Sequence, residues 1–146
     1  MSRRLGRGRP IIAVGGVLAL IGSFLPWVSA GEITGQVVTG NGLSGTGILV
    51  FVAAVGVLML ILLPYAAASG RSGLDQPPAY AILGLIAVVG MVLSLAQLLT
   101  ADALQLWPPD KAPGLVLAVA GTLLIAVGVA ELIGEGRSEP PLRPRR

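Results

Sequence analysis

Charged residues divide the chain into long apolar stretches, and this spacing is typical of a membrane protein. The uncharged gaps contain 22 residues after Arg9, 38 after Glu32, 26 after Asp75 and 19 after Lys111. A helix needs about 20 apolar residues to cross the hydrocarbon layer, so each gap can hold one helix. The pattern predicts helices at about 11–28, 47–67, 79–101 and 114–133.

None of these stretches has a polar face wide enough for a soluble amphipathic helix. A helix that is apolar on all sides is either deeply buried or surrounded by lipid, and 146 residues are too few to bury four such helices. The predicted fold class is an all-α membrane protein, a left-handed four-transmembrane-helix bundle. The predicted organisation is a basic N-terminus at 1–10, a transmembrane domain at 11–134 and a disordered tail at 135–146.

The last stretch is the shortest and therefore tests the prediction. Residues 114–130 contain nine Leu, Ile or Val. Together these favour insertion by about 3 to 5 kcal/mol. Glu131 lies about 26 Å from Gly114 along such a helix, where its carboxylate can reach the headgroups.

The first stretch allows two interpretations. "SRRLGRGR" followed by an apolar run and "VSA" before Gly31 fits a cleaved secretory signal. The run is longer than a usual signal core, and Pro26 with Trp27 suits a helix that stops at the membrane surface. We therefore expect a retained first helix, and cleavage stays the alternative.

Small residues indicate how the helices associate, because membrane helices approach closely where side chains are small. Along the fourth helix they recur every four residues, at Gly114, Ala118, Thr122, Ala126, Ala130 and Gly134. Along the third they alternate at spacings of three and four, at Ala87, Gly90, Ser94, Gln97 and Ala101. The second spacing is that of a left-handed seam. The pattern predicts close contact between the third and fourth helices.

The segment between the first two helices is rich in glycine, "SAGEITGQVVTGNGLSGTG". Its alternating Val and Thr and the Asn41–Gly42 pair allow a short β-hairpin with its turn at that pair. A flexible outer loop over 29–46 is the other interpretation.

Charge adds an orientation to this picture. Nine of the ten cationic residues, all but Lys111, fall on one side of the predicted membrane. The positive-inside rule then places both termini and the 68–78 loop in the cytoplasm of a bacterial plasma membrane. Arginines near the surface also attract anionic lipid, although topology alone explains them. The predicted interface anchors are Trp27 and Trp107 outside and Tyr65 and Tyr80 inside.

Composition excludes several function classes. The chain is 54% hydrophobic and 12% charged, with a mean hydropathy of +0.86 and a pI near 10.2. Its cations lie at the ends of apolar segments rather than along one face, so no nucleic-acid partner is expected. It contains no Cys and no His, and no nucleotide-binding motif. We predict no cofactor, no metal site and no enzymatic activity.

The basic N-terminus, "GSFLPWVS" at 22–29, the Gly-rich segment and the Arg-rich tail resemble uncharacterised four-helix integral membrane proteins of GC-rich, actinobacterial-type bacteria. The resemblance implies no activity. Two hypotheses follow, with the lipid bilayer as the first partner of both. One is a non-enzymatic protein that acts by helix–helix association with itself or another membrane protein, as an accessory subunit. The other is a small oligomeric transporter or channel whose polar path comprises Ser94, Gln97 and Glu131.

Overall fold

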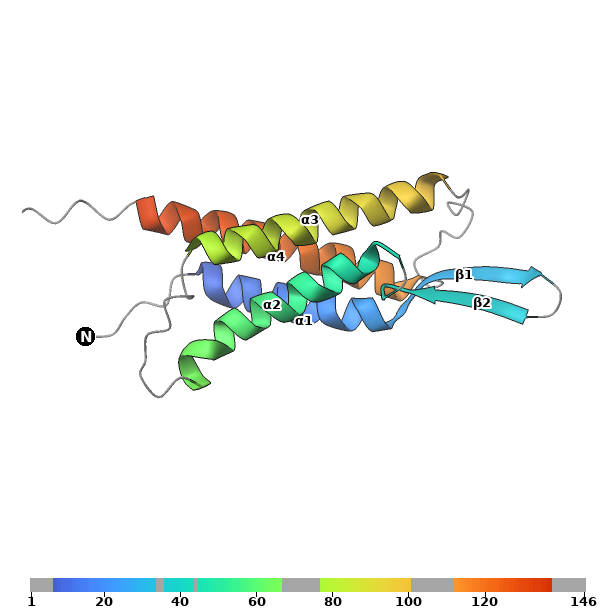
Figure 1. The fold of residues 1–146 in the computed structure, drawn as a ribbon, viewed down its shortest axis with the longest axis horizontal. Helices are drawn as coiled ribbons and strands as arrows, with labels where there is room; N and C mark the ends of the chain where they lie inside the picture. Colours follow the sequence, from blue (N-terminus) through green and yellow to red (C-terminus); the bar gives the residue numbers. More distant parts are fainter. Residues whose placement is uncertain (1–6, 34–35, 44, 67–76, 101–111, 138–146) are drawn as a thin grey trace, which may run out of the picture.

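The computed structural model describes residues 7–33, 36–43, 45–66, 77–100 and 112–137. Within these residues the chain forms four helices and a two-stranded sheet (Figure 1). The helices are α1 (Gly8–Phe24), α2 (Gly47–Ala66), α3 (Pro77–Thr100) and α4 (Pro113–Arg137), and the strands are β1 (Pro26–Ile33) and β2 (Gln36–Asn41).

The helices pack as an antiparallel bundle in which each one contacts its neighbours in the chain. Phe24 near the end of α1 meets Phe51 near the start of α2, with ring centroids 5.6 Å apart in an edge-to-face arrangement. Gly56 of α2 faces Leu83 of α3, and Gly84 of α3 faces Val129 of α4. α4 then packs along α1, which closes the bundle. The fold class that the sequence predicts is confirmed.

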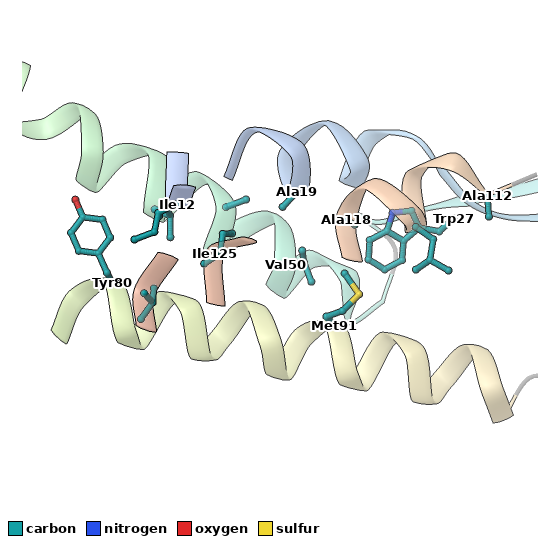
Figure 2. Close-up of a cluster of buried hydrophobic side chains, with 13 residues drawn as sticks. Ile12, Ala19, Trp27, Val50, Tyr80, Met91, Ala112, Ala118 and Ile125 are labelled. Carbon is teal, nitrogen blue, oxygen red and sulfur yellow. The ribbon is translucent and has the colours of Figure 1, made fainter. Parts of the chain in front are cut away.

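The buried positions follow a spacing of three and four residues along each helix. On α1 they include Gly8, Ile12, Gly15, Ala19 and Gly22, and on α3 Tyr80, Gly84, Ala87, Met91 and Ser94. This spacing averages 3.5 residues and is that of left-handed knobs-into-holes packing. Figure 2 shows the resulting core, in which Ile12, Val50, Ile125 and Met91 project inward from four different helices.

The outer faces are apolar, as lipid requires. Large exposed side chains occur on every helix, among them Val14, Met59, Leu85 and Leu123. Three of the described helices are long and apolar enough to span a membrane. Only 28 to 33% of each membrane-length stretch is buried inside the bundle. α1 is apolar but shorter, at 17 residues. The chain is therefore a small multi-pass membrane protein.

Helix bounds differ from the prediction mainly at α1 and α4. α1 begins at Gly8 and ends at Phe24 rather than at Val28, because Leu25 is already extended, at φ −81° and ψ 160°, ahead of Pro26. α4 continues to Arg137, four residues beyond the predicted end. Pro77 and Pro78 begin α3, since proline is tolerated in a first turn where its missing N–H costs nothing.

The Gly-rich segment forms the hairpin, which projects beyond the helices along the long axis of the molecule (Figure 1). β1 and β2 pair antiparallel, with Pro26 opposite Asn41 and Ile33 opposite Gln36. The short hairpin that the sequence allows is confirmed, but the Asn41–Gly42 pair is not its turn, because Asn41 ends β2 and pairs with the first residue of β1. The first strand begins within "FLPWVSAG", at Pro26. Because these residues are apolar, the sequence pattern assigned them up to Val28 to the first helix.

Candidate functional site

The closest helix contact is between α1 and α4, and glycines on both sides produce it. A methyl group placed on Gly15 would lie 2.8 Å from the Gly121 carbonyl oxygen. One on Gly22 would lie 2.5 Å from the Ala118 amide nitrogen, and one on Gly128 would lie 2.9 Å from the Gly8 carbonyl oxygen. All three distances are too short for a real carbon, so only glycine permits this approach of the backbones.

These glycines repeat every seven residues on both helices, at Gly8, Gly15 and Gly22 and at Gly114, Gly121 and Gly128. A seven-residue step advances the helix by 700°, only 20° short of two turns, so the glycines stay on one face. The predicted every-four series drifts by about 40° per step. Its first members, Gly114, Ala118 and Thr122, are buried, whereas Ala130 and Gly134 are exposed.

α3 and α4 do contact one another, but through side chains. A methyl group on Gly84 would meet the Val129 methyl carbon at 3.2 Å, without touching the α4 backbone. The predicted seam on α3 has buried residues at Ala87, Gly90 and Ser94. Gly90 faces α2, where a methyl group would lie 2.7 Å from the Leu49 Cβ. The predicted contact between the third and fourth helices is thus present, but the tightest contact of α4 is with α1, where the seven-residue glycine repeats of the two helices meet.

Trp27 closes the hairpin end of the bundle. It lies in β1 at an irregularity of the register between Pro26 and Val28, and extra residues at such bulges are turned out of the normal alternation. The side chain is 6% exposed, and its indole N–H donates to the Gly22 carbonyl oxygen at 2.8 Å. This bond satisfies a carbonyl at the end of α1 that has no intrahelical partner. The ring lies so close to Gly42 that a methyl group there would be 2.6 Å from it.

A polar cluster joins the start of α2 to α3. The Thr46 and Ser94 hydroxyl oxygens lie 3.0 Å apart, and Thr46 Oγ1 is 2.9 Å from Gln97 Oε1. Ser94 also donates to the Gly90 carbonyl oxygen at 2.8 Å. Sequence reasoning found Ser94 and Gln97 but missed Thr46. Its position before α2 is one where threonine commonly caps a helix, and that signal could have identified it.

Two carboxylates lie near the end of α4, at the other end of the bundle. Glu131 and Glu135 line a shallow open groove together with Val127, Ala130 and Gly134. Both glutamates are exposed. Glu135 accepts a hydrogen bond from the Arg7 backbone N–H at 2.9 Å, next to the start of α1. A carboxylate there is stabilised by the helix dipole of α1.

The bundle does not bring Ser94 and Gln97 together with Glu131. Gly84 lies level with Val129, and Gln97 is 13 residues beyond Gly84 toward the hairpin end. At a rise of 1.5 Å per residue, Gln97 and Glu131 are therefore roughly 20 Å or more apart along the bundle. The core between them contains apolar side chains such as Val50, Val57 and Ile125. Among the described residues, no three His, Cys, Asp or Glu lie close enough to hold a metal ion.

The predicted anchors are only partly described. Trp107 and the Tyr65 side chain lie outside the described residues. Tyr80 is 1% exposed and packs between α3 and α2, with its ring in the core of Figure 2. Trp27 and Tyr80 thus contribute to the packing of the two ends of the bundle. Their anchoring role at a membrane surface stays a prediction.

The chain matches no protein-family model, no curated protein and no solved structure with which it was compared. The expected resemblance is therefore confirmed only as far as a small four-helix protein with three apolar helices of membrane-spanning length.

Proposed function

We propose that this chain is an accessory subunit of a bacterial plasma-membrane complex, which binds a transmembrane helix of another protein through the outer face of α4. The observation that carries the proposal is the groove at Val127, Ala130, Glu131, Gly134 and Glu135. It combines small residues with carboxylates on a face that no other helix of the described residues covers.

Small residues allow a second helix to approach closely in lipid, and a polar group near the membrane boundary adds a hydrogen bond to a partner. Glu131 is suited to that second role, because an exposed carboxylate beside apolar side chains gains from a donor at the same depth. The seven-residue glycine face of α1 and α4 is already occupied within the bundle. Among the described residues, the end of α4 around Ala130 and Gly134 is a small-residue surface that stays exposed and adjoins two carboxylates.

Purification in a mild detergent tests the proposal. We expect a larger membrane protein to co-purify with the wild-type chain in a fixed ratio. Ala130→Phe fills the groove and should abolish that association. Val92→Phe is the matched control, because Val92 is 58% exposed on α3, away from the groove, and also gains a bulky ring.

Two results would contradict this proposal. One is a chain that purifies alone in several mild detergents at native expression. The other is a partner that binds Ala130→Phe as well as it binds wild type. A discrete homo-oligomer that conducts ions in liposomes would favour the transporter hypothesis instead.

The orientation that best fits this function has both termini in the cytoplasm, with the hairpin outside. The arginines at the two ends of the sequence support it through the positive-inside rule. In this orientation the groove lies toward the cytoplasmic leaflet, where a basic residue at the end of a partner helix can reach Glu131.

A further inference from the structure

We infer that Glu131 selects the helix that binds the α4 groove, and that this helix carries one basic side chain at the depth of the Glu131 carboxylate. The inference rests on the proposed function, because it names the chemistry of the partner that the groove takes. It starts from a difference between the two carboxylates of the groove, Glu131 and Glu135, which lie about one helical turn apart on α4.

Glu135 already has a partner within the bundle. It accepts a hydrogen bond from the Arg7 backbone N–H at 2.9 Å, beside the start of α1. In the part of the chain that the structure describes, no hydrogen bond or ion pair engages the Glu131 carboxylate. Both glutamate side chains are exposed. Glu131 is therefore the carboxylate with which a second helix can pair.

Glu131 also lies deeper than Glu135, at a level where α3 presents an apolar surface. The contact between Gly84 of α3 and Val129 of α4 shows how the two helices are aligned. Glu131 lies two residues from this contact on α4, and Ile82 lies two residues from it on α3, toward the same end because the helices are antiparallel. Ile82 is 61% exposed, so acyl chains reach this level. A carboxylate beside hydrocarbon gains more from a nearby cation than one in open water does.

The charge of the groove favours a cation over a neutral or acidic partner. Carboxylates four residues apart repel each other on a helix surface, and the groove holds such a pair. A lysine or arginine beside Glu131 lowers this repulsion and forms a hydrogen bond between two charged groups. A glutamine there donates a hydrogen bond but leaves both negative charges uncompensated, and a glutamate adds a third. Charge complementarity therefore indicates a basic partner helix.

The shape of α4 brings the partner closest at this same level. Ala130 and Gly134 are small and four residues apart, a spacing that lets two helix backbones approach closely. Farther toward the hairpin end, the exposed side of α4 presents larger side chains, with Leu123 61% and Val116 40% exposed. A partner helix therefore contacts the last turns of α4 most closely, where its basic side chain meets Glu131.

Synthetic transmembrane peptides test this chemistry with the full-length chain in mixed micelles of phosphatidylcholine and a neutral detergent. Each peptide is a helix of about 20 leucine and alanine residues with one variable residue near one end, which is lysine, glutamine or glutamate. Energy transfer from a donor at the N-terminus of the chain to an acceptor on the peptide measures binding. We expect the lysine peptide to bind about tenfold tighter than the glutamine peptide, and the glutamate peptide to bind weakest.

Three variants assign the preference to one residue. Glu131→Gln should remove the preference for lysine, whereas Glu135→Gln, the matched control one turn away, should keep it. Ala130→Phe should abolish the binding of every peptide, because it fills the groove. A carbodiimide, which joins a carboxylate to an amine in contact with it, should crosslink the lysine peptide to Glu131 of the wild-type chain. Circular dichroism checks that every variant keeps its helix content.

The outcomes separate this inference from the proposed function. Equal affinity for the lysine and glutamine peptides, lost in Ala130→Phe, would overturn the selection by charge and keep the groove as a docking site. A preference for lysine that survives Glu131→Gln, or a crosslink at Glu135 instead, would overturn the role of Glu131. Absence of binding by all three peptides would overturn both proposals. A dimer of the chain that Ala130→Phe removes and the lysine peptide does not displace would make a second copy the occupant, against the inference.

Discussion

Gly121 illustrates how a single missing side chain determines the packing of this protein. A methyl group there would meet the Ala19 amide nitrogen and would lie 2.6 Å from the Gly15 carbonyl oxygen. Both atoms belong to the α1 backbone, which cannot move aside as a flexible side chain can. A methyl group on Gly134, on the same helix, would have no neighbouring atom within 4 Å. The two glycines therefore form a matched pair with opposite expected responses.

Gly121→Ala should lower the free energy of unfolding by about 1 to 3 kcal/mol, because it overpacks a rigid interface. Gly134→Ala should be neutral or raise it by up to about 1 kcal/mol through better helix propensity. Reversible unfolding in mixed micelles, followed by circular dichroism, measures both. Equal effects of the two substitutions would show that α1 and α4 do not approach through this face.

Trp27 should behave as a buried residue of the bundle. In a Trp107→Phe background it is the one remaining tryptophan. Because its ring is 6% exposed and its N–H is bonded to Gly22, its fluorescence should be weakly quenched by acrylamide and by lipids spin-labelled at the headgroup. Strong quenching by the labelled lipid would indicate the surface-anchor role instead.

Trp27→Phe should cost about 1 kcal/mol of unfolding free energy, since it removes one hydrogen bond and leaves the Gly22 carbonyl without that donor. The same micelle unfolding assay measures it. Met59→Leu, on the exposed side of α2, is a control that changes a large apolar side chain without changing this bond.

At the scale of elements, the lengths of the uncharged stretches predicted each of the four helices of the described residues. Charged side chains are costly in lipid, so they mark where a membrane-spanning stretch ends. These lengths could not locate the end of α1, since "LPWVSA" is as apolar as a helix and yet is extended after Leu25. The interface between α1 and α4 was within reach of the sequence through the seven-residue glycine repeat. The hydrogen bond from Thr46 to α3 could not be predicted from the sequence, because it depends on how α2 and α3 are aligned along the bundle axis.

Thr46 and Ser94 should be energetically coupled across α2 and α3. Thr46→Val and Ser94→Ala should each destabilise the bundle, and the double variant should cost less than their sum by about 0.6 kcal/mol. A second double-mutant cycle, which pairs Thr46→Val with Thr122→Val, is the control. Thr122 donates to Ala118 within its own helix, so no coupling is expected there.

At the scale of the whole molecule, the orientation can be tested cleanly because the chain contains no cysteine. Gly35→Cys, between the two strands, should react with a membrane-impermeant maleimide in intact cells. Ser138→Cys, after α4, should react only after the cells are made permeable. Labelling in the reverse pattern would overturn the proposed orientation.

Retention of α1 is a further whole-molecule prediction. Loss of residues 1–30 would expose the α4 glycine face that α1 covers, so we expect the mature protein to keep its first helix. A chain tagged at both ends should give one membrane-bound band that carries both tags. A band with only the C-terminal tag, shorter by about three kilodaltons, would indicate cleavage.

The brevity of α1 has a consequence for the surrounding lipid. Its 17 residues rise about 25 Å, and the uncharged part of α4, Pro113–Ala130, rises about 27 Å. The 24 uncharged residues of α3 rise about 36 Å. A bilayer with a hydrocarbon core of about 30 Å is thus thicker than the α1–α4 pair and thinner than α3, which can match it by tilting. We therefore expect the acyl chains beside α1 and α4 to shorten or splay, and the protein to prefer thin regions of the membrane.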